Sequence, residues 1–121
     1  MYPIYSTNGE WVAMLHEGRL YDTLGEWIAW LDDKEVYNRD GQYVGFLSDE
    51  ARGTCGRILR ERIRRNKPLR HAPPGSPKIR PPSHAPLAPL FAELPWNVMD
   101  VFEDNADIFR YISELRPDWE D

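Results

Sequence analysis

The sequence predicts a mainly β protein: a shallow antiparallel barrel of tandem β-hairpins, followed by a proline-rich arm and a short α-helical C-terminal segment. Three observations predict this fold. A 16-residue pattern repeats through the first fifty residues, glycine-containing turns recur inside it, and nine prolines crowd residues 68–95. A hydrophobic content of 41% is too high for a wholly disordered chain. The length of 121 residues allows one small domain with appendages and argues against a two-domain enzyme.

The repeat occupies residues 5–52, which divide without a gap into three units beginning at Tyr5, Tyr21 and Tyr37. The units read YSTNGEWVAMLHEGRL, YDTLGEWIAWLDDKEV and YNRDGQYVGFLSDEAR. The columns that match are tyrosine, glycine, an aromatic residue, a branched aliphatic residue, a small residue, a large apolar residue and leucine. Agreement at a fixed period is typical of repeat architectures, so each unit is expected to form the same structure.

Each unit is predicted to be a β-hairpin. Asn8-Gly9 and Asp40-Gly41 are dipeptides typical of two-residue type I′ turns, and the second unit keeps the glycine as Gly25. The six strands predicted from the three units span residues 2–7, 10–15, 19–23, 26–31, 35–39 and 42–48.

A two-residue turn would place residue 5 opposite residue 12, and cross-strand pairs share a face. The aromatic, small and leucine columns then lie together on one face, which must be covered or must line something because both faces are largely apolar. The small column indicates close approach of backbones or of a central element, and tight packing in a small barrel is favoured over a ligand contact. The candidate apolar barrel face is Trp11, Ala13, Leu15, Trp27, Ala29, Leu31, Tyr43, Gly45 and Leu47.

Three hairpins do not close a ring, so a fourth is expected within residues 48–67, which gives about eight strands with pseudo-four-fold symmetry. The match of this segment to the repeat is poor. An arginine-rich amphipathic helix over residues 57–66, with Ile58, Leu59 and Ile63 inward, is the alternative, and so short a run does not decide between them.

The charges form three blocks. Residues 1–51 hold ten acids against three basic residues, residues 52–80 hold ten basic residues against one acid, and residues 81–121 hold nine acids against two basic residues. The basic block either folds back on its acidic neighbours or contacts an anionic partner. Candidate anion or partner contacts are Arg57, Arg60, Arg62, Arg64, Arg65, Lys67 and Arg70.

The tandem repeats to about residue 66, followed by PPGSPKIRPPSHAPLAPL and PWNVMDVFE, resemble the bacterial four-fold beta flower family. The resemblance implies a roughly square barrel of four hairpin petals with an apolar centre, and a family of unknown function with no defined catalytic or binding residues. The distant similarity of that barrel to Tubby-like domains, which bind phosphoinositide lipids or carry an apolar central helix, implies a ligand or lipid role as one alternative.

Three segments are predicted: the hairpin barrel over residues 1–67, the arm over residues 68–95 and an acidic amphipathic helical tail over residues 96–121. The arm favours extended polyproline II, as a spacer wrapping the barrel or as a docking arm for a partner. In the tail, Asn97 is expected to cap a helix over residues 98–103, and a second helix is expected to end at Leu115.

The sequence lacks phosphate-loop, nucleophile-elbow, zinc-protease and dinucleotide motifs, so we predict no enzyme activity. Cys55 is the single cysteine, which excludes an intrachain disulfide and a four-thiolate zinc site, and no metal or cofactor is expected. Because no apolar run of membrane-spanning length and no signal sequence is present, a soluble cytoplasmic protein is expected.

These observations predict a non-catalytic interaction or structural module that binds a protein partner, or a second copy of the chain, through residues 68–121. The alternative is a carrier or sensor that binds an apolar ligand or an anionic lipid at the barrel centre. Nucleic-acid binding is less favoured, because the aromatic residues are not interleaved with the basic ones.

Overall fold

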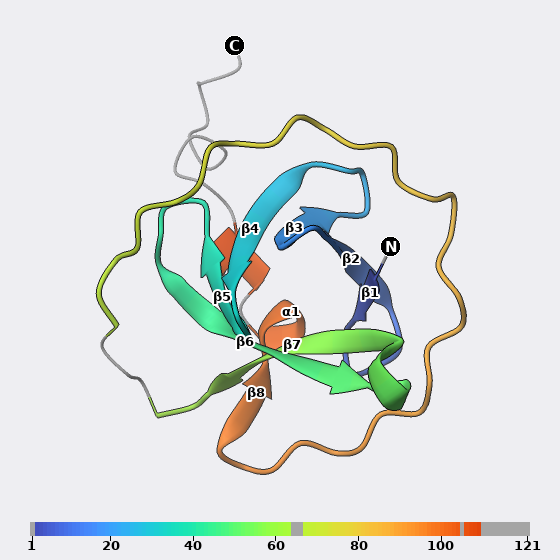
Figure 1. Cartoon of the computed structure of the whole chain (residues 1–121). Helices are drawn as coiled ribbons and strands as arrows, with labels where there is room; N and C mark the ends of the chain where they lie inside the picture. The colour runs from blue at the N-terminus through green and yellow to red at the C-terminus, as the bar shows by residue number, and fades with distance from the viewer. Residues whose placement is uncertain (1, 64–66, 105, 110–121) are drawn as a thin grey trace.

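The structure, a computed structural model, describes residues 2–63, 67–104 and 106–109. Its sheet has eight strands, each hydrogen-bonded to the next along the chain. A parallel bridge between Ile4 and Gly56 joins the first strand to the seventh and closes a seven-stranded barrel, to which the eighth strand is added (Figure 1). The strands are β1 (Tyr2–Tyr5), β2 (Trp11–His16), β3 (Arg19–Asp22), β4 (Trp27–Asp32), β5 (Glu35–Asn38), β6 (Tyr43–Glu50), β7 (Cys55–Glu61) and β8 (Val98–Asp100). The predicted mainly β barrel is confirmed.

The three repeat units form the same hairpin, but the predicted turn type is wrong. In the first hairpin, the Gly9 N–H donates to the Ser6 carbonyl over 2.9 Å and the Ser6 N–H donates to the Glu10 carbonyl over 2.8 Å. The loop therefore has three residues and ends in Gly9 at a positive φ of 91°. Both bonds recur in the second and third hairpins, at Asp22 and Asn38.

The longer loop changes the cross-strand register. Tyr5 pairs with Trp11 rather than with residue 12, and the register shifts at the next pair, where Ile4 faces Ala13. The same shift occurs between β3 and β4 and between β5 and β6. The expected register is therefore wrong by one position at Tyr5, beside the turn, whereas Ile4, Pro3 and Tyr2 face residues 13, 14 and 15 as that register requires. Because of the shift, the aromatic column and the small column pack in different clusters.

Two apolar clusters lie on the two sides of the barrel wall. The inner cluster fills the barrel and includes residues from the C-terminal segment, whereas the outer cluster packs against Ala72 and Ile79 of the arm. The inner cluster consists of Ile4, Ala13, Leu20, Ile28, Ala29, Val36, Val44, Ile58, Val101 and Phe109. The outer cluster consists of Met14, Tyr21, Trp27, Trp30, Tyr37 and Tyr43.

The fourth hairpin is formed by β7 and β8. Residues 55–61 are a strand, so the helix alternative is wrong there, while residues 64–66 of that alternative lie outside the described residues. The second strand comes from beyond the arm rather than from within residues 48–67. The Arg62 N–H donates to the Asn97 carbonyl over 2.9 Å, as Ser6 donates to Glu10 in the first hairpin. The loop of the fourth hairpin is therefore the whole of residues 63–96.

After β8 the chain enters the barrel. The expected helix over residues 98–103 is wrong at its start, because residues 98–100 pair with β7 and the helix α1 is Val101–Asp104. A 3-10 helix, η2 (Ala106–Phe109), follows, and the Phe109 ring stacks on Phe102 with centroids 4.8 Å apart. Figure 1 shows α1 at the centre of the barrel, and Val101 and Phe109 of this segment belong to the inner cluster. The remainder of the second predicted helix lies outside the described residues.

None of the helices in the described ranges has the length and apolarity that crossing a bilayer requires.

Candidate functional site

The arm passes around the outside of the barrel (Figure 1). From residue 67 to residue 95 the described chain forms neither helix nor strand, as its prolines predict. It leaves β7, passes the tips of the third, second and first hairpins in that order, and returns to the fourth hairpin through β8. Both ends of the arm are thus fixed in one hairpin.

At two hairpin tips the arm is bound through its backbone. The Arg70 N–H donates to the Gly41 carbonyl over 2.9 Å, and the Ile79 N–H donates to the Gly25 carbonyl over 2.9 Å. A Cβ placed on either glycine would lie 2.0 Å from the carbonyl oxygen of the same arm residue. Gly25 and Gly41, which the sequence explains by their turns, are therefore also required by the close approach of the arm.

The arm carries a repeat of its own, which sequence reasoning missed. Arg70 and Ile79 are nine positions apart, and nine positions further Ala88 lies 3.8 Å from where a Cβ on Gly9 would be. Each is the third residue of a tripeptide that begins with proline, and Asn97 of the fourth hairpin continues the series. The period was obscured because five further prolines lie between its members. The prolines in phase are Pro68, Pro77, Pro86 and Pro95.

An aromatic band lies beneath the first part of the arm. Trp30 and Tyr37 are stacked with ring centroids 4.9 Å apart, and Tyr43 meets Tyr37 edge-on at 5.9 Å. The Arg70 guanidinium lies 5.1 Å from the Tyr37 centroid, and the Lys67 ammonium lies 4.6 Å from that of Tyr43. Cations over ring faces attract the ring quadrupole, so this band holds the basic end of the arm.

The basic block pairs with acids of the repeats. Arg70 binds Asp32 at 2.6 Å and Lys67 binds Glu35. The hydrogen bond from Lys67 lowers the pKa of the Glu35 carboxyl, and the hydrogen bond to Asp32 raises the pKa of Arg70. Folding back on acidic neighbours, one of the two predicted arrangements, is therefore present at these pairs.

Five of the seven predicted anion contacts lie in the described part of the chain, and their surroundings differ. Arg57 is buried and pairs with Glu50 at 2.9 Å, and Lys67 and Arg70 pair as described. Arg60 is half-buried and Arg62 is exposed. Arg64 and Arg65 lie outside the described residues. Three of the seven side chains thus bind acids of this chain.

The nine residues of the predicted apolar face are divided between the two sides of the wall. The aromatic column belongs to the outer cluster, whereas the small and leucine columns face the inner one. A Cβ on Gly45 would lie 2.1 Å from the Leu59 carbonyl oxygen, so close backbone approach occurs at this column. The inner-facing members are Ala13, Leu15, Ala29, Leu31, Gly45 and Leu47, and the outer members are Trp11, Trp27 and Tyr43.

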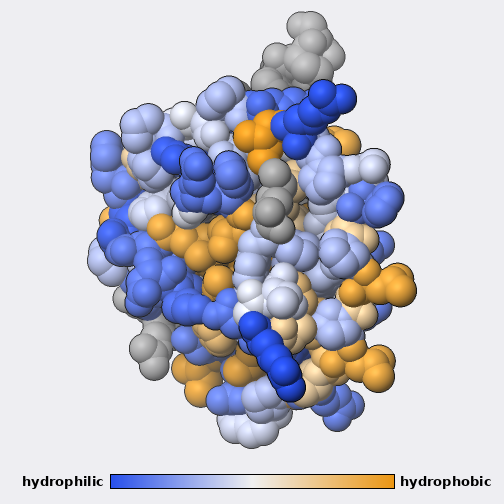
Figure 2. All heavy atoms as spheres, turned by 45° about the vertical axis from the view of Figure 1, so that its right-hand side comes forward, coloured by the Kyte–Doolittle hydropathy of each residue, from blue (hydrophilic) through white to orange (hydrophobic). Residues whose placement is uncertain are grey.

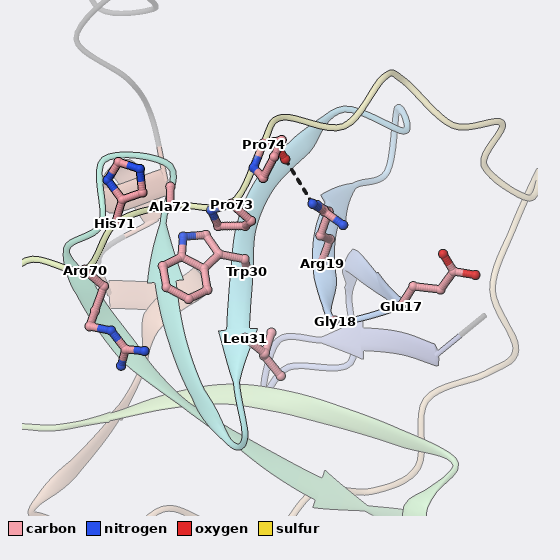
Figure 3. Close-up of a pocket in the computed structure, with 10 residues that line it drawn as sticks. All are labelled: Glu17, Gly18, Arg19, Trp30, Leu31, Arg70, His71, Ala72, Pro73 and Pro74. Atoms are coloured by element: carbon pink, nitrogen blue, oxygen red, sulfur yellow. Dashed lines mark hydrogen bonds between the residues drawn. The ribbon is translucent and has the colours of Figure 1, made fainter.

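A pocket of about 630 Å³ lies between the arm and the barrel wall (Figure 3). Trp30 and the arm residues 70–74 form one side, and Arg19, which donates to the Pro74 carbonyl over 2.9 Å, crosses to the arm beside them. His71 and Glu17, the groups that could exchange protons, lie at opposite ends (Figure 3). The pocket offers an aromatic wall and cations without a paired acid and base, so its chemistry suits binding.

The outward side of the arm exposes large apolar residues. Leu87 and Leu90 are 98% and 104% exposed, and Trp96 is 80% exposed. Figure 2 brings forward the side of the barrel crossed by this part of the arm and shows hydrophobic side chains protruding between polar ones. Phe91 points the other way and lies beneath the Arg57 guanidinium, 4.7 Å from its ring centroid.

The single thiol has no reactive environment. Cys55 is buried, and burial raises its pKa, so little thiolate forms near neutral pH. Across residues 2–63, 67–104 and 106–109, no three His, Cys, Asp or Glu side chains are grouped as a metal ion would require.

A closed barrel of repeated hairpins, with a central apolar segment and a proline-rich arm, defines the class of the fold. The family model described as 4-fold beta flower protein matches residues 2–99. The chain belongs to this family, as its repeats indicated. No curated protein and no solved structure matches the chain.

Proposed function

We propose that this protein is a non-catalytic interaction module, in which the barrel is a rigid platform and the arm presents apolar side chains to a protein partner. The observation that carries the proposal is the nearly complete exposure of Leu87 and Leu90 on a segment fixed at both of its ends. Single exposed apolar residues are common on soluble proteins. Here two leucines and Trp96 project within ten positions of a proline-rich segment.

The arm is held firmly where these side chains project. The Tyr5 hydroxyl donates to the Pro86 carbonyl, one residue before Leu87. Phe91, one residue after Leu90, is covered by the buried Arg57, which also donates to the Ala92 carbonyl over 3.3 Å. A segment anchored on both sides of its exposed residues loses little conformational entropy on binding, which favours its use as a docking surface.

The carrier alternative has less support. The apolar interior is packed with side chains of this chain, including Val101 and Phe109, which are 0% and 5% exposed. A ligand at the barrel centre would have to displace them. The interaction module therefore accounts for both the filled centre and the apolar outward side of the arm.

The test is site-specific photocrosslinking in the native host cells. Benzoylphenylalanine replaces Leu90 in the full-length chain, and in a matched control it replaces Leu24, an exposed leucine at the second hairpin tip. We expect a discrete protein adduct from position 90 and none from position 24, and we expect Leu87→Asp to remove it. The same adducts from both positions, or none from position 90, would refute the proposal.

A further inference from the structure

The contact between the arm and the barrel is a repeated recognition event. Two unrelated periods meet there: hairpin tips recur every 16 residues, and arm contacts recur every nine, in the opposite direction around the ring. A loop that only packs against the barrel does not need a repeat of its own that matches the spacing of the hairpin tips. Agreement at three successive tips indicates that each tip binds the same kind of segment.

The second and third tips recognise backbone rather than a particular side chain. The donor to the glycine carbonyl belongs to Arg70 at one tip and to Ile79 at the next, so the N–H is shared while the side chain differs. The residue two positions earlier is proline in both cases, at Pro68 and Pro77. Proline predisposes the chain to an extended course with free backbone donors and acceptors, which is how proline-rich ligands are read by other proteins.

The repeat tyrosines add a second contact to the arm. The Tyr5 hydroxyl donates to the Pro86 carbonyl, and the Tyr21 hydroxyl shares a hydrogen bond of 2.7 Å with Ser76. The Arg70 guanidinium donates to the Tyr37 hydroxyl over 3.3 Å. Every tyrosine of the column that starts the repeat is thus bonded to the arm.

The burial of the arm repeats with the nine-residue period at the two ends of the unit. The first two residues of each unit are exposed, so their side chains face away from the barrel. The ninth residue is half-buried in each of the three complete units, and these residues are Ser76, Ala85 and Leu94. Contact confined to a few positions per unit is characteristic of a docked ligand, whose outward side remains free.

From these observations we propose that the three hairpin tips form a receptor for proline-rich chains with a nine-residue spacing, and that it accepts such a segment of another protein in exchange for the arm. This surface is distinct from the outward leucines of the proposed function. A tethered arm competes at an effective concentration of the order of millimolar, so the exchange is weak until the arm is loosened.

The test uses a fluorescent peptide of residues 67–97 and the full-length chain. Arg70→Pro with Ile79→Pro removes both N–H donors of the arm and leaves the barrel unchanged. Fluorescence anisotropy is expected to show at least tenfold tighter peptide binding to this variant than to the wild type. Adding Gly25→Ala should reverse the gain, whereas adding Gly18→Ala should not, because a Cβ at Gly18 meets nothing within 4 Å.

Two further peptides define the specificity. One glycine inserted after Gly75 breaks the spacing and is expected to weaken binding, whereas replacing Leu87 and Leu90 by serine should leave it unchanged. Sensitivity to the serines would assign binding to the outward side of the arm instead. Equal binding of the spaced and interrupted peptides, or no binding to the loosened variant, would overturn the receptor.

The wild-type chain gives an independent answer if the double variant does not fold. Titration with millimolar peptide is expected to shift the amide resonances of Gly25 and Gly41 but not that of Gly18. Unmoved Gly25 and Gly41 resonances would overturn the proposal while leaving the photocrosslinking test of the leucines unaffected.

Discussion

Gly25→Ala isolates the bond between a hairpin tip and the arm. Gly25 has a φ of 91°, and an added Cβ would lie 2.0 Å from the Ile79 carbonyl oxygen and 3.2 Å from Pro81 Cδ. The arm must then move away and lose the hydrogen bond from Ile79. Gly18 is a matched control, because its φ of 77° imposes similar strain on alanine while its surroundings are open.

The expected magnitude follows from what the two variants share. The left-handed conformation costs alanine about 1–2 kcal/mol at either position. Only Gly25→Ala also loses a backbone hydrogen bond, which contributes about 1 kcal/mol net. The free energy for opening the arm at Ile79 should therefore fall by about 1 kcal/mol in Gly25→Ala alone, which is about a fivefold larger open population.

Limited trypsin digestion reads this opening directly, because the exposed Lys78 precedes Ile79 in the arm. When opening is fast relative to cleavage, the cleavage rate tracks the open population. Mass spectrometry should show cleavage after Lys78 about fivefold faster in Gly25→Ala than in Gly18→Ala. Equal rates in the two variants would refute the role of the glycine in holding the arm.

Three other changes probe the ion pairs and the core. Arg57→Ala leaves the half-buried Glu50 carboxylate without its partner and should lower the free energy of unfolding by about 3 kcal/mol in urea titrations. Lys67 holds the pKa of Glu35 below its ordinary 4.5, so this pair stabilises the fold above pH 4.5 and the stabilisation is lost as pH falls through the lowered pKa. The difference in urea midpoint between wild type and Glu35→Gln should therefore vanish on acidification, and a constant difference would contradict the pairing. Phe109→Ala removes a buried ring from the inner cluster and should cost about 3 kcal/mol by calorimetry, whereas an unchanged transition would exclude the segment from the core.

The hairpins were predictable because their signal is local and repeated. The pairing beside each turn was not, because it depends on the residue after the repeat tyrosine, whose role was not predicted. Asp22 Oδ1 accepts from the Leu24 and Glu26 N–H groups, both over 2.9 Å, and Asn38 repeats this arrangement. A short polar side chain directly after the tyrosine therefore shapes the loop in the second and third units, whereas in the first unit Asn8 Oδ1 accepts from the Glu10 N–H. The turn dipeptides indicated where the chain reverses, but not how many residues the loop contains.

The fourth hairpin could not be predicted by local rules. Its strands lie on either side of the arm, and the only local pattern in residues 98–103 is a helical spacing of apolar residues. Pairing with β7 overrides that pattern at residues 98–100, because a strand edge supplies hydrogen-bond partners that a short helix lacks. The division of the candidate apolar face likewise followed from the shift beside each turn, which separates the aromatic column from the small column.

The agreement of the two periods makes the length of the arm a constraint, which a deletion can test. Ser83 is exposed and lies between Ile79 and Ala88. Deleting it leaves the contact at Gly25 in phase but displaces the Tyr5 bond to Pro86, whereas Ser83→Gly keeps both. Tyr5→Phe should then destabilise the wild type by about 1 kcal/mol, the net contribution of one hydrogen bond, and should have no effect in the deletion background. An equal cost in both backgrounds would mean that slack in the arm absorbs the deletion, and that the nine-residue spacing does not determine where the arm is bound.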